Sequence, residues 1–83
     1  MTDSDTPYQP ISCAMHSEYE LAIMHRRILQ LVWHDTNKIE HIGQLQPLDL
    51  RTENQAEYLL AQGDKGQPLK IRLDYIQQYR ILD

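Results

Sequence analysis

The residue types that most often do chemistry in proteins meet at one place in this 83-residue chain, where Cys13 is followed three positions later by His16. A thiolate and an imidazole at this spacing can supply two ligands to a zinc ion, but a zinc site needs three or four. The other histidines, His25, His34 and His41, show no spacing that would complete the set. We therefore predict that the chain binds no metal and needs no cofactor.

The same pair lacks the other parts of a cysteine nucleophile. Such a nucleophile needs a third group that orients its base, and donors that stabilise an oxyanion. The chain contains no phosphate-binding loop, no G-x-G-x-x-G motif and no paired-carboxylate motif. The sequence therefore predicts that the protein is not an enzyme, and a metal-dependent or thiol enzyme using Cys13 and His16 is the least favoured alternative.

A second group of candidate residues lies near the C-terminus, where Lys70 and Arg72 alternate with aliphatic residues and Tyr75 follows. Two basic side chains beside an exposed aromatic ring can contact the phosphates of RNA and stack on its bases. The formal charge of the chain is −4, however, and a negative net charge opposes binding to a polyanion. We interpret Lys70 and Arg72 as the solvent face of an ordinary strand, and keep RNA binding by these three residues as an alternative.

The net negative charge is concentrated at the N-terminal end. Residues 1–25 contain four carboxylates and neither Lys nor Arg, whereas the rest of the chain contains eight basic and eight acidic residues. The four carboxylates are those of Asp3, Asp5, Glu18 and Glu20. A one-sided field of this kind steers encounters with a basic partner.

A helix is predicted over about residues 13–25, with either Ser12 or Ser17 as its N-cap. At the helical period one face is apolar and should pack on the domain; it carries Met15, Tyr19, Ala22 and Ile23. The other face carries Ser17, Glu20, Leu21 and Met24. Two explanations remain open for Leu21 and Met24, namely burial of both helix faces in a groove and contact with a partner protein.

After Arg26 the pattern becomes alternating, which is typical of strands. Strands are predicted over about residues 29–34, 38–45, 56–62, 69–74 and 79–82, with turns at 35–37 and 63–66. A mostly polar loop with a short strand piece is predicted at residues 46–54. One helix followed by five short strands predicts a mainly β domain, namely a small five-stranded Sm-like barrel with the helix over one open end. Its interior would hold Leu29, Leu31, Trp33, Leu60, Leu69, Ile71, Leu73 and Ile81.

The length is that of one domain with a single small core. We predict a flexible acidic tail at residues 1–7 and a single domain at residues 8–83. No apolar run approaches the roughly 20 residues that span a bilayer, the N-terminus lacks the features of a signal peptide, and one cysteine fits a reducing compartment. The sequence therefore predicts a cytoplasmic protein that does not contact a membrane.

Several short segments together carry a resemblance: Y-Q-P-I at 8–11, then Cys13, E-L-A at 20–22, D-L at 49–50, E-Y-L at 57–59 and L-D-Y-I at 73–76. In this order and spacing the chain resembles the Rho-binding antiterminator family (Rof, also called YaeO) from about residue 8 to residue 76. The opening Y-Q-P-I-x-C is the most distinctive part of the match.

The resemblance implies an Sm-like barrel with an N-terminal helix, acting as a non-catalytic inhibitor of the transcription termination factor Rho. Members of this family bind the N-terminal domain of Rho at its primary RNA site, compete with RNA and cause antitermination. Acidic residues of the helix region make that contact, and Glu20 in the E-L-A match is the contact implied here. Where the family carries an aromatic and an acidic residue, this chain has His16 and Ser17, followed by Glu18.

The charge pattern and the resemblance indicate the same surface. An exposed ion pair contributes only about 0–1 kcal/mol, so carboxylates need apolar contacts beside them to give tight binding. The residues that we expect to contact the partner are Tyr8, His16, Ser17, Glu18, Glu20, Leu21 and Met24. We expect the protein to act as a monomer.

Overall fold

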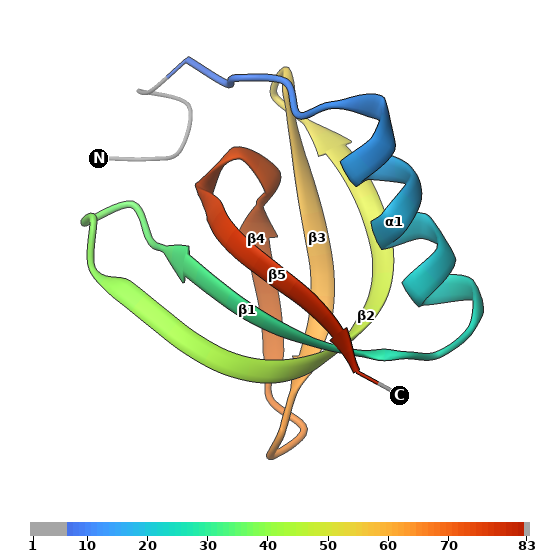
Figure 1. Ribbon diagram of the computed structural model, residues 1–83. Helices are drawn as coiled ribbons and strands as arrows, with labels where there is room; N and C mark the ends of the chain where they lie inside the picture. Colours follow the sequence, from blue (N-terminus) through green and yellow to red (C-terminus); the bar gives the residue numbers. More distant parts are fainter. Residues whose placement is uncertain (1–6, 83) are drawn as a thin grey trace.

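One α-helix leads into a five-stranded antiparallel sheet in the computed structural model, which describes residues 7–82 (Figure 1). In chain order the elements are α1 (Cys13–Met24), β1 (Ile28–His34), β2 (Glu40–Glu53), β3 (Ala56–Gly63), β4 (Pro68–Arg72), the 3-10 helix η2 (Leu73–Tyr75) and β5 (Ile76–Leu82). The predicted mainly β class with an N-terminal helix is confirmed. The predicted tail at residues 1–7, with Asp3 and Asp5, lies outside the described residues apart from Pro7.

Helix α1 begins at Cys13, and its N-cap is Ser12, the first of the two predicted caps. The Ser12 hydroxyl accepts a hydrogen bond from the amide of Met15 at 3.2 Å, so it satisfies an amide that the helix leaves without a partner. The helix ends at Met24, and Arg26 then takes a left-handed conformation with φ 54°. This reversal directs the chain into β1.

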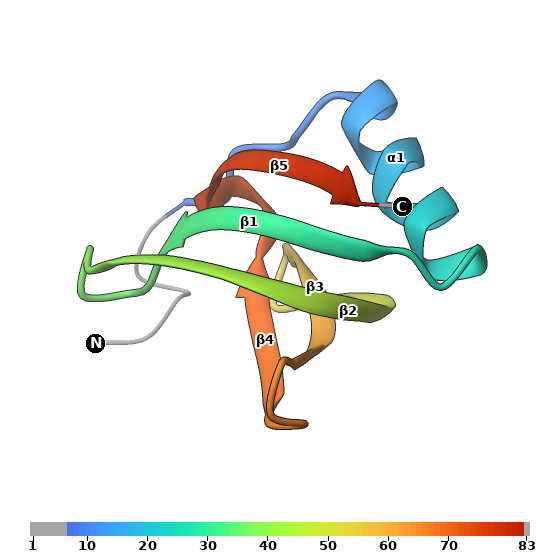
Figure 2. The ribbon, with the colours of Figure 1, turned by 60° about the horizontal axis from the view of Figure 1, so that its bottom comes forward.

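The inward face of α1 matches the predicted one. Tyr19 and Ala22 are buried, and the Tyr19 ring packs edge-on against Tyr79 of β5 with 5.3 Å between ring centroids. Burial raises the pKa of Tyr19, so the ring stays neutral. Figure 2 shows α1 lying across one end of the curved sheet.

Strand β2 continues to Glu53, whereas the sequence predicts a loop with only a short strand piece at residues 46–54. Proline has no amide to donate to a sheet, and the register of β2 against β3 shifts between Pro47 and Asp49. The bulge accommodates the buried Pro47 and bends the strand. The first half of β2 therefore pairs with β1 and the second half with β3 (Figure 1).

The inward side of β3 also differs from the prediction. Leu59, rather than Leu60, is fully buried, and Leu50 of β2 lies opposite it in the sheet. Because Leu59 and Leu60 are consecutive, the sequence does not show which of them faces the core. The pairing of β3 with β2 determines that Leu59 does. The other predicted interior residues are buried or partly buried against the same core: Leu29, Leu31, Trp33, Leu69, Ile71, Leu73 and Ile81.

The strands within residues 7–82 form a sheet that is not closed, so the predicted barrel is not confirmed. The strand order is β4-β3-β2-β1-β5, so β4 and β5 are the two edges of the sheet. Strand β5 begins at Ile76, three residues before the predicted start, and follows η2 directly. No helix within residues 7–82 is long and apolar enough to cross a membrane.

Candidate functional site

The N-terminal lead-in to α1 is held by a buried ion pair. Arg72 is 1% exposed, and its Nε lies 2.8 Å from Oδ1 of Asp74. The second oxygen of Asp74 accepts hydrogen bonds from Nη2 of Arg72 and from the backbone amide of Gln9, both at 3.0 Å. The Arg72 guanidinium also lies 5.5 Å from the centre of the Tyr8 ring. Residues 8–9 are therefore fixed to the end of β4.

These contacts contradict the prediction that Arg72 is on the solvent face, and they contradict the exposed Tyr75 that the RNA-binding alternative requires. Tyr75 is buried, its ring centre lies 4.8 Å from the Arg72 guanidinium, and it packs against His34. Lys70 is exposed, but it pairs with Glu53 and lies 4.6 Å from the centre of the Tyr58 ring. The three candidate RNA-binding residues thus do not form an exposed basic and aromatic surface.

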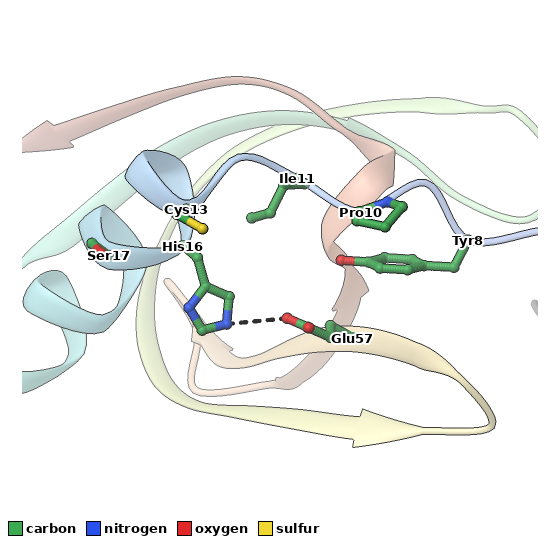
Figure 3. A pocket seen from close by; sticks show the side chains of 7 residues that line it. All are labelled: Tyr8, Pro10, Ile11, Cys13, His16, Ser17 and Glu57. Carbon is green, nitrogen blue, oxygen red and sulfur yellow. Dashed lines mark ion pairs between the residues drawn. The ribbon is translucent and has the colours of Figure 1, made fainter.

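His16 bridges two carboxylates that come from different elements. Its Nδ1 lies 2.7 Å from Oε1 of Glu20 on α1, and its Nε2 lies 3.1 Å from Oε2 of Glu57 on β3. Figure 3 shows the His16 ring pointing from the helix toward Glu57. The two ring nitrogens of His16 thus each face a carboxylate, and the imidazole links α1 to β3.

A pocket of about 410 Å³ lies between the lead-in, the start of α1 and β3 (Figure 3). It is lined by Tyr8, Pro10, Ile11, Cys13, His16, Ser17 and Glu57. Burial, followed by the charges of Glu57 and Asp74, raises the pKa of Tyr8, so its hydroxyl stays protonated at neutral pH. Within residues 7–82 no three His, Cys, Asp or Glu side chains are grouped as they would be around a metal. The pocket presents the exposed thiol of Cys13, the ring of His16 and the carboxylate of Glu57.

The outward face of α1 carries the acidic and apolar side chains that the sequence indicates. Leu21 is 50% exposed and Met24 is 73% exposed, which excludes burial of both helix faces in a groove. Ser17, Glu18 and Glu20 are exposed beside them. In the described part of the chain Glu18 forms no ion pair, and Glu20 pairs with His16 alone.

Two further carboxylates join this face from the sheet. Glu57 reaches it through His16, and Asp49 of β2 lines a groove together with Glu20 and Met24. Prediction from charge along the chain missed both residues, because they lie outside the acidic segment 1–25, in a part of the chain with balanced charge. Both do lie in segments that carry the family resemblance, D-L at 49–50 and E-Y-L at 57–59.

Comparison with known proteins gives a likeness of fold. No protein-family model matches the chain, and no curated protein matches it. The structure is similar to part of the proteasome accessory factor B/C (PafBC) of Arthrobacter aurescens, with a TM-score of 0.73 and 19% identity over 88% of this chain. The match spans 12% of the PafBC chain, and at this identity it concerns the fold alone.

Proposed function

We propose that this protein is a non-catalytic inhibitor of the transcription termination factor Rho and belongs to the Rho-binding antiterminator family. It would bind the N-terminal RNA-binding domain of Rho at the primary RNA site, keep RNA from loading and so cause antitermination. It would act as a cytoplasmic monomer without a cofactor. The family assignment implies an Sm-like barrel with an N-terminal helix. Helix α1 and the five-stranded antiparallel sheet support the mainly β part of that architecture, although the sheet is not closed.

The observation that supports the proposal most is that the segments carrying the resemblance meet on one side of the molecule. The Y-Q-P-I segment is joined to L-D-Y-I by the hydrogen bond from Gln9 to Asp74. His16, which lies between the Cys13 and E-L-A matches, joins α1 to E-Y-L through Glu57. Glu20 and the D-L pair line the same groove. Segments far apart in the sequence therefore contact α1 and its lead-in.

The chemistry of this surface suits a partner that normally binds RNA. Carboxylates of Glu18 and Glu20 can take the place of phosphates at basic side chains of the partner. Leu21 and Met24 are exposed next to them and can supply the apolar centre that most stable interfaces need. Tyr8 is half-buried against Arg72, so we assign its ring to holding the lead-in and only its exposed edge to partner contact.

The alternative, direct RNA binding by Lys70, Arg72 and Tyr75, has less support. Two of these side chains are buried, and the third is paired with Glu53. A protein that binds RNA through them would have to break the ion pair between Arg72 and Asp74.

Charge reversal at Glu20 tests the proposed surface. Glu20→Lys should weaken the complex with purified Rho by about tenfold or more, because a repulsive charge at a close pair costs roughly 1.4 kcal/mol or more. Inhibition of Rho-dependent termination in vitro should be lost in parallel. The measurements are equilibrium binding to the Rho hexamer and a transcription termination assay.

The matched control is Asp64→Lys, which makes the same charge change in the exposed turn between β3 and β4, at the opposite end of the molecule from the start of α1 (Figure 1). This variant should lose only the long-range attraction, which salt screens. Equal loss of binding in both variants, or full inhibition by Glu20→Lys, would contradict the assignment of this surface.

A further inference from the structure

A groove of about 310 Å³ runs between α1 and β2. Figure 1 shows the helix alongside the later half of this strand. The groove is lined by His16, Glu20, Ile23, Met24, Asp49 and Leu50. The packing of a helix on a bent strand therefore makes a surface that neither element presents by itself.

The walls of this groove combine apolar side chains with carboxylates that are only partly satisfied. Ile23, Met24 and Leu50 supply the apolar part. Oδ1 of Asp49 accepts a hydrogen bond from the amide of Leu50 at 2.9 Å, and Asp49 forms no ion pair in the described part of the chain. Glu20 uses Oε1 toward His16. One oxygen of each carboxylate thus stays available to an incoming donor.

We propose that this groove receives an arginine side chain of a protein partner. This proposal rests on the function proposed above, which names Rho as the partner. It adds one specific contact, an arginine of the partner, and it adds residues of β2 to the binding surface. The aliphatic stem of arginine can pack on Met24 and Leu50. Its guanidinium can donate to Glu20 on the helix side and to Asp49 on the strand side.

The charge and the hydrogen-bond acceptors of the groove favour an arginine over an apolar, an anionic or a lysine side chain. An apolar side chain would bury Asp49 without a counter-charge, together with the second oxygen of Glu20, and this costs free energy. An anionic group would meet like charges. A lysine ammonium is a point charge, whereas the guanidinium has five donors in a planar fork and can serve acceptors on two walls at once.

Substitution of Asp49 tests the groove with an internal control. Asp49→Asn keeps the oxygen that accepts from the amide of Leu50, so the strand is preserved, but it removes the charge. We expect binding to Rho to weaken about five- to tenfold, mainly through faster dissociation. Asp64→Asn removes the same charge from the exposed turn between β3 and β4 and should change the affinity by less than about twofold, because the charge it removes is screened.

A second measurement does not depend on Rho. The methyl signals of Ile23 and Leu50 in NMR spectra are followed while N-acetyl-arginine amide is added to the intact protein. The proposal predicts saturable shifts, weaker shifts with N-acetyl-lysine amide, and loss of the saturable shifts in Asp49→Asn.

The outcomes separate this proposal from the function on which it rests. If Glu20→Lys disrupts binding to Rho while Asp49→Asn behaves like Asp64→Asn and the arginine derivative leaves the methyl signals unmoved, the groove assignment is wrong and the proposed function stands. If Rho does not bind the wild-type protein but the arginine derivative gives saturable shifts, the groove assignment stands and the partner is a different basic protein.

Discussion

At the scale of single residues, Arg72 shows how far a side chain can depart from the role its position in a strand indicates. Alternation in 69–74 predicts a solvent-exposed arginine, yet the guanidinium is buried between Tyr8, Tyr75 and Asp74. A buried ion pair persists only when each charge keeps its partner. The arginine is therefore part of the structure that holds the N-terminal lead-in.

Removal of this arginine should be strongly destabilising. Arg72→Met leaves Asp74 largely buried without its counter-charge, and loss of one partner of such a pair costs about 3–5 kcal/mol of unfolding free energy. Urea denaturation of the two proteins measures the difference. Arg51→Met, which removes an exposed arginine from β2, serves as control and should cost less than about 1 kcal/mol.

The double variant Arg72→Met/Asp74→Leu removes both charges and should recover part of the lost stability, since no buried charge is left unpaired. If Arg72→Met is no less stable than Arg51→Met, the role assigned to the ion pair is incorrect.

His16 acts at the same scale on the proposed partner surface. Its ring lies between Glu20 and Glu57 and so links the helix to β3. The family resemblance implies an aromatic residue near this position, whereas His16 contacts the carboxylates of Glu20 and Glu57. Spacing alone could not show this contact, because Glu57 follows His16 by 41 positions in the sequence.

At the scale of elements, the hairpin between β1 and β2 depends on one carboxylate. Asp35 accepts hydrogen bonds from the amides of Asn37 and Ile39, at 2.8 and 3.0 Å, and pairs with His41 at 2.9 Å. The hydrogen bond with His41, followed by the one with the Ile39 amide, lowers the pKa of Asp35. A carboxyl group with a lowered pKa in the folded state stabilises the fold only while it is ionised.

Asp35→Asn should therefore lower the melting temperature at neutral pH. The difference in melting temperature between Asp35→Asn and wild type should shrink once the pH falls below the usual aspartate pKa of about 3.9. It should vanish as the pH passes through the lower pKa of Asp35 in the folded protein, because the wild-type carboxylate then becomes protonated. Thermal unfolding at pH 7, 4 and 2 measures this trend. Asp64→Asn should show no such trend, and a difference between Asp35→Asn and wild type that stays constant with pH would count against the role of the charge.

The sequence predicts elements well where local chemistry decides them. The hydroxyl of Ser12 starts α1, the alternation of Leu29 and Leu31 places β1, and glycines mark the turn at 63–66. Prediction fails where pairing between strands decides the structure. Pro47 suggests a break in β2, but a bulge absorbs it, and only the pairing with Leu50 places Leu59 inward.

At the scale of the whole molecule, the arrangement of strands could not be read from the sequence. Five strands at hairpin spacing allow either a closed barrel or an open sheet, and β4 and β5 stay apart as the two edges. The candidate surface was predicted in part: α1 and its outward side chains are where the pattern indicates, whereas Asp49 and Glu57 join it through the fold. The similarity to part of PafBC concerns the same architecture, which by itself does not imply a function.

Competition between this protein and RNA tests the central proposal most directly. Purified Rho is mixed with the labelled protein, and a short pyrimidine RNA is added in increasing amounts. We expect a saturable complex that the RNA displaces in proportion to its occupancy of the primary site, and no complex between the protein and RNA when Rho is absent. Failure to form a complex with Rho, or a complex that RNA leaves unchanged, would contradict the account.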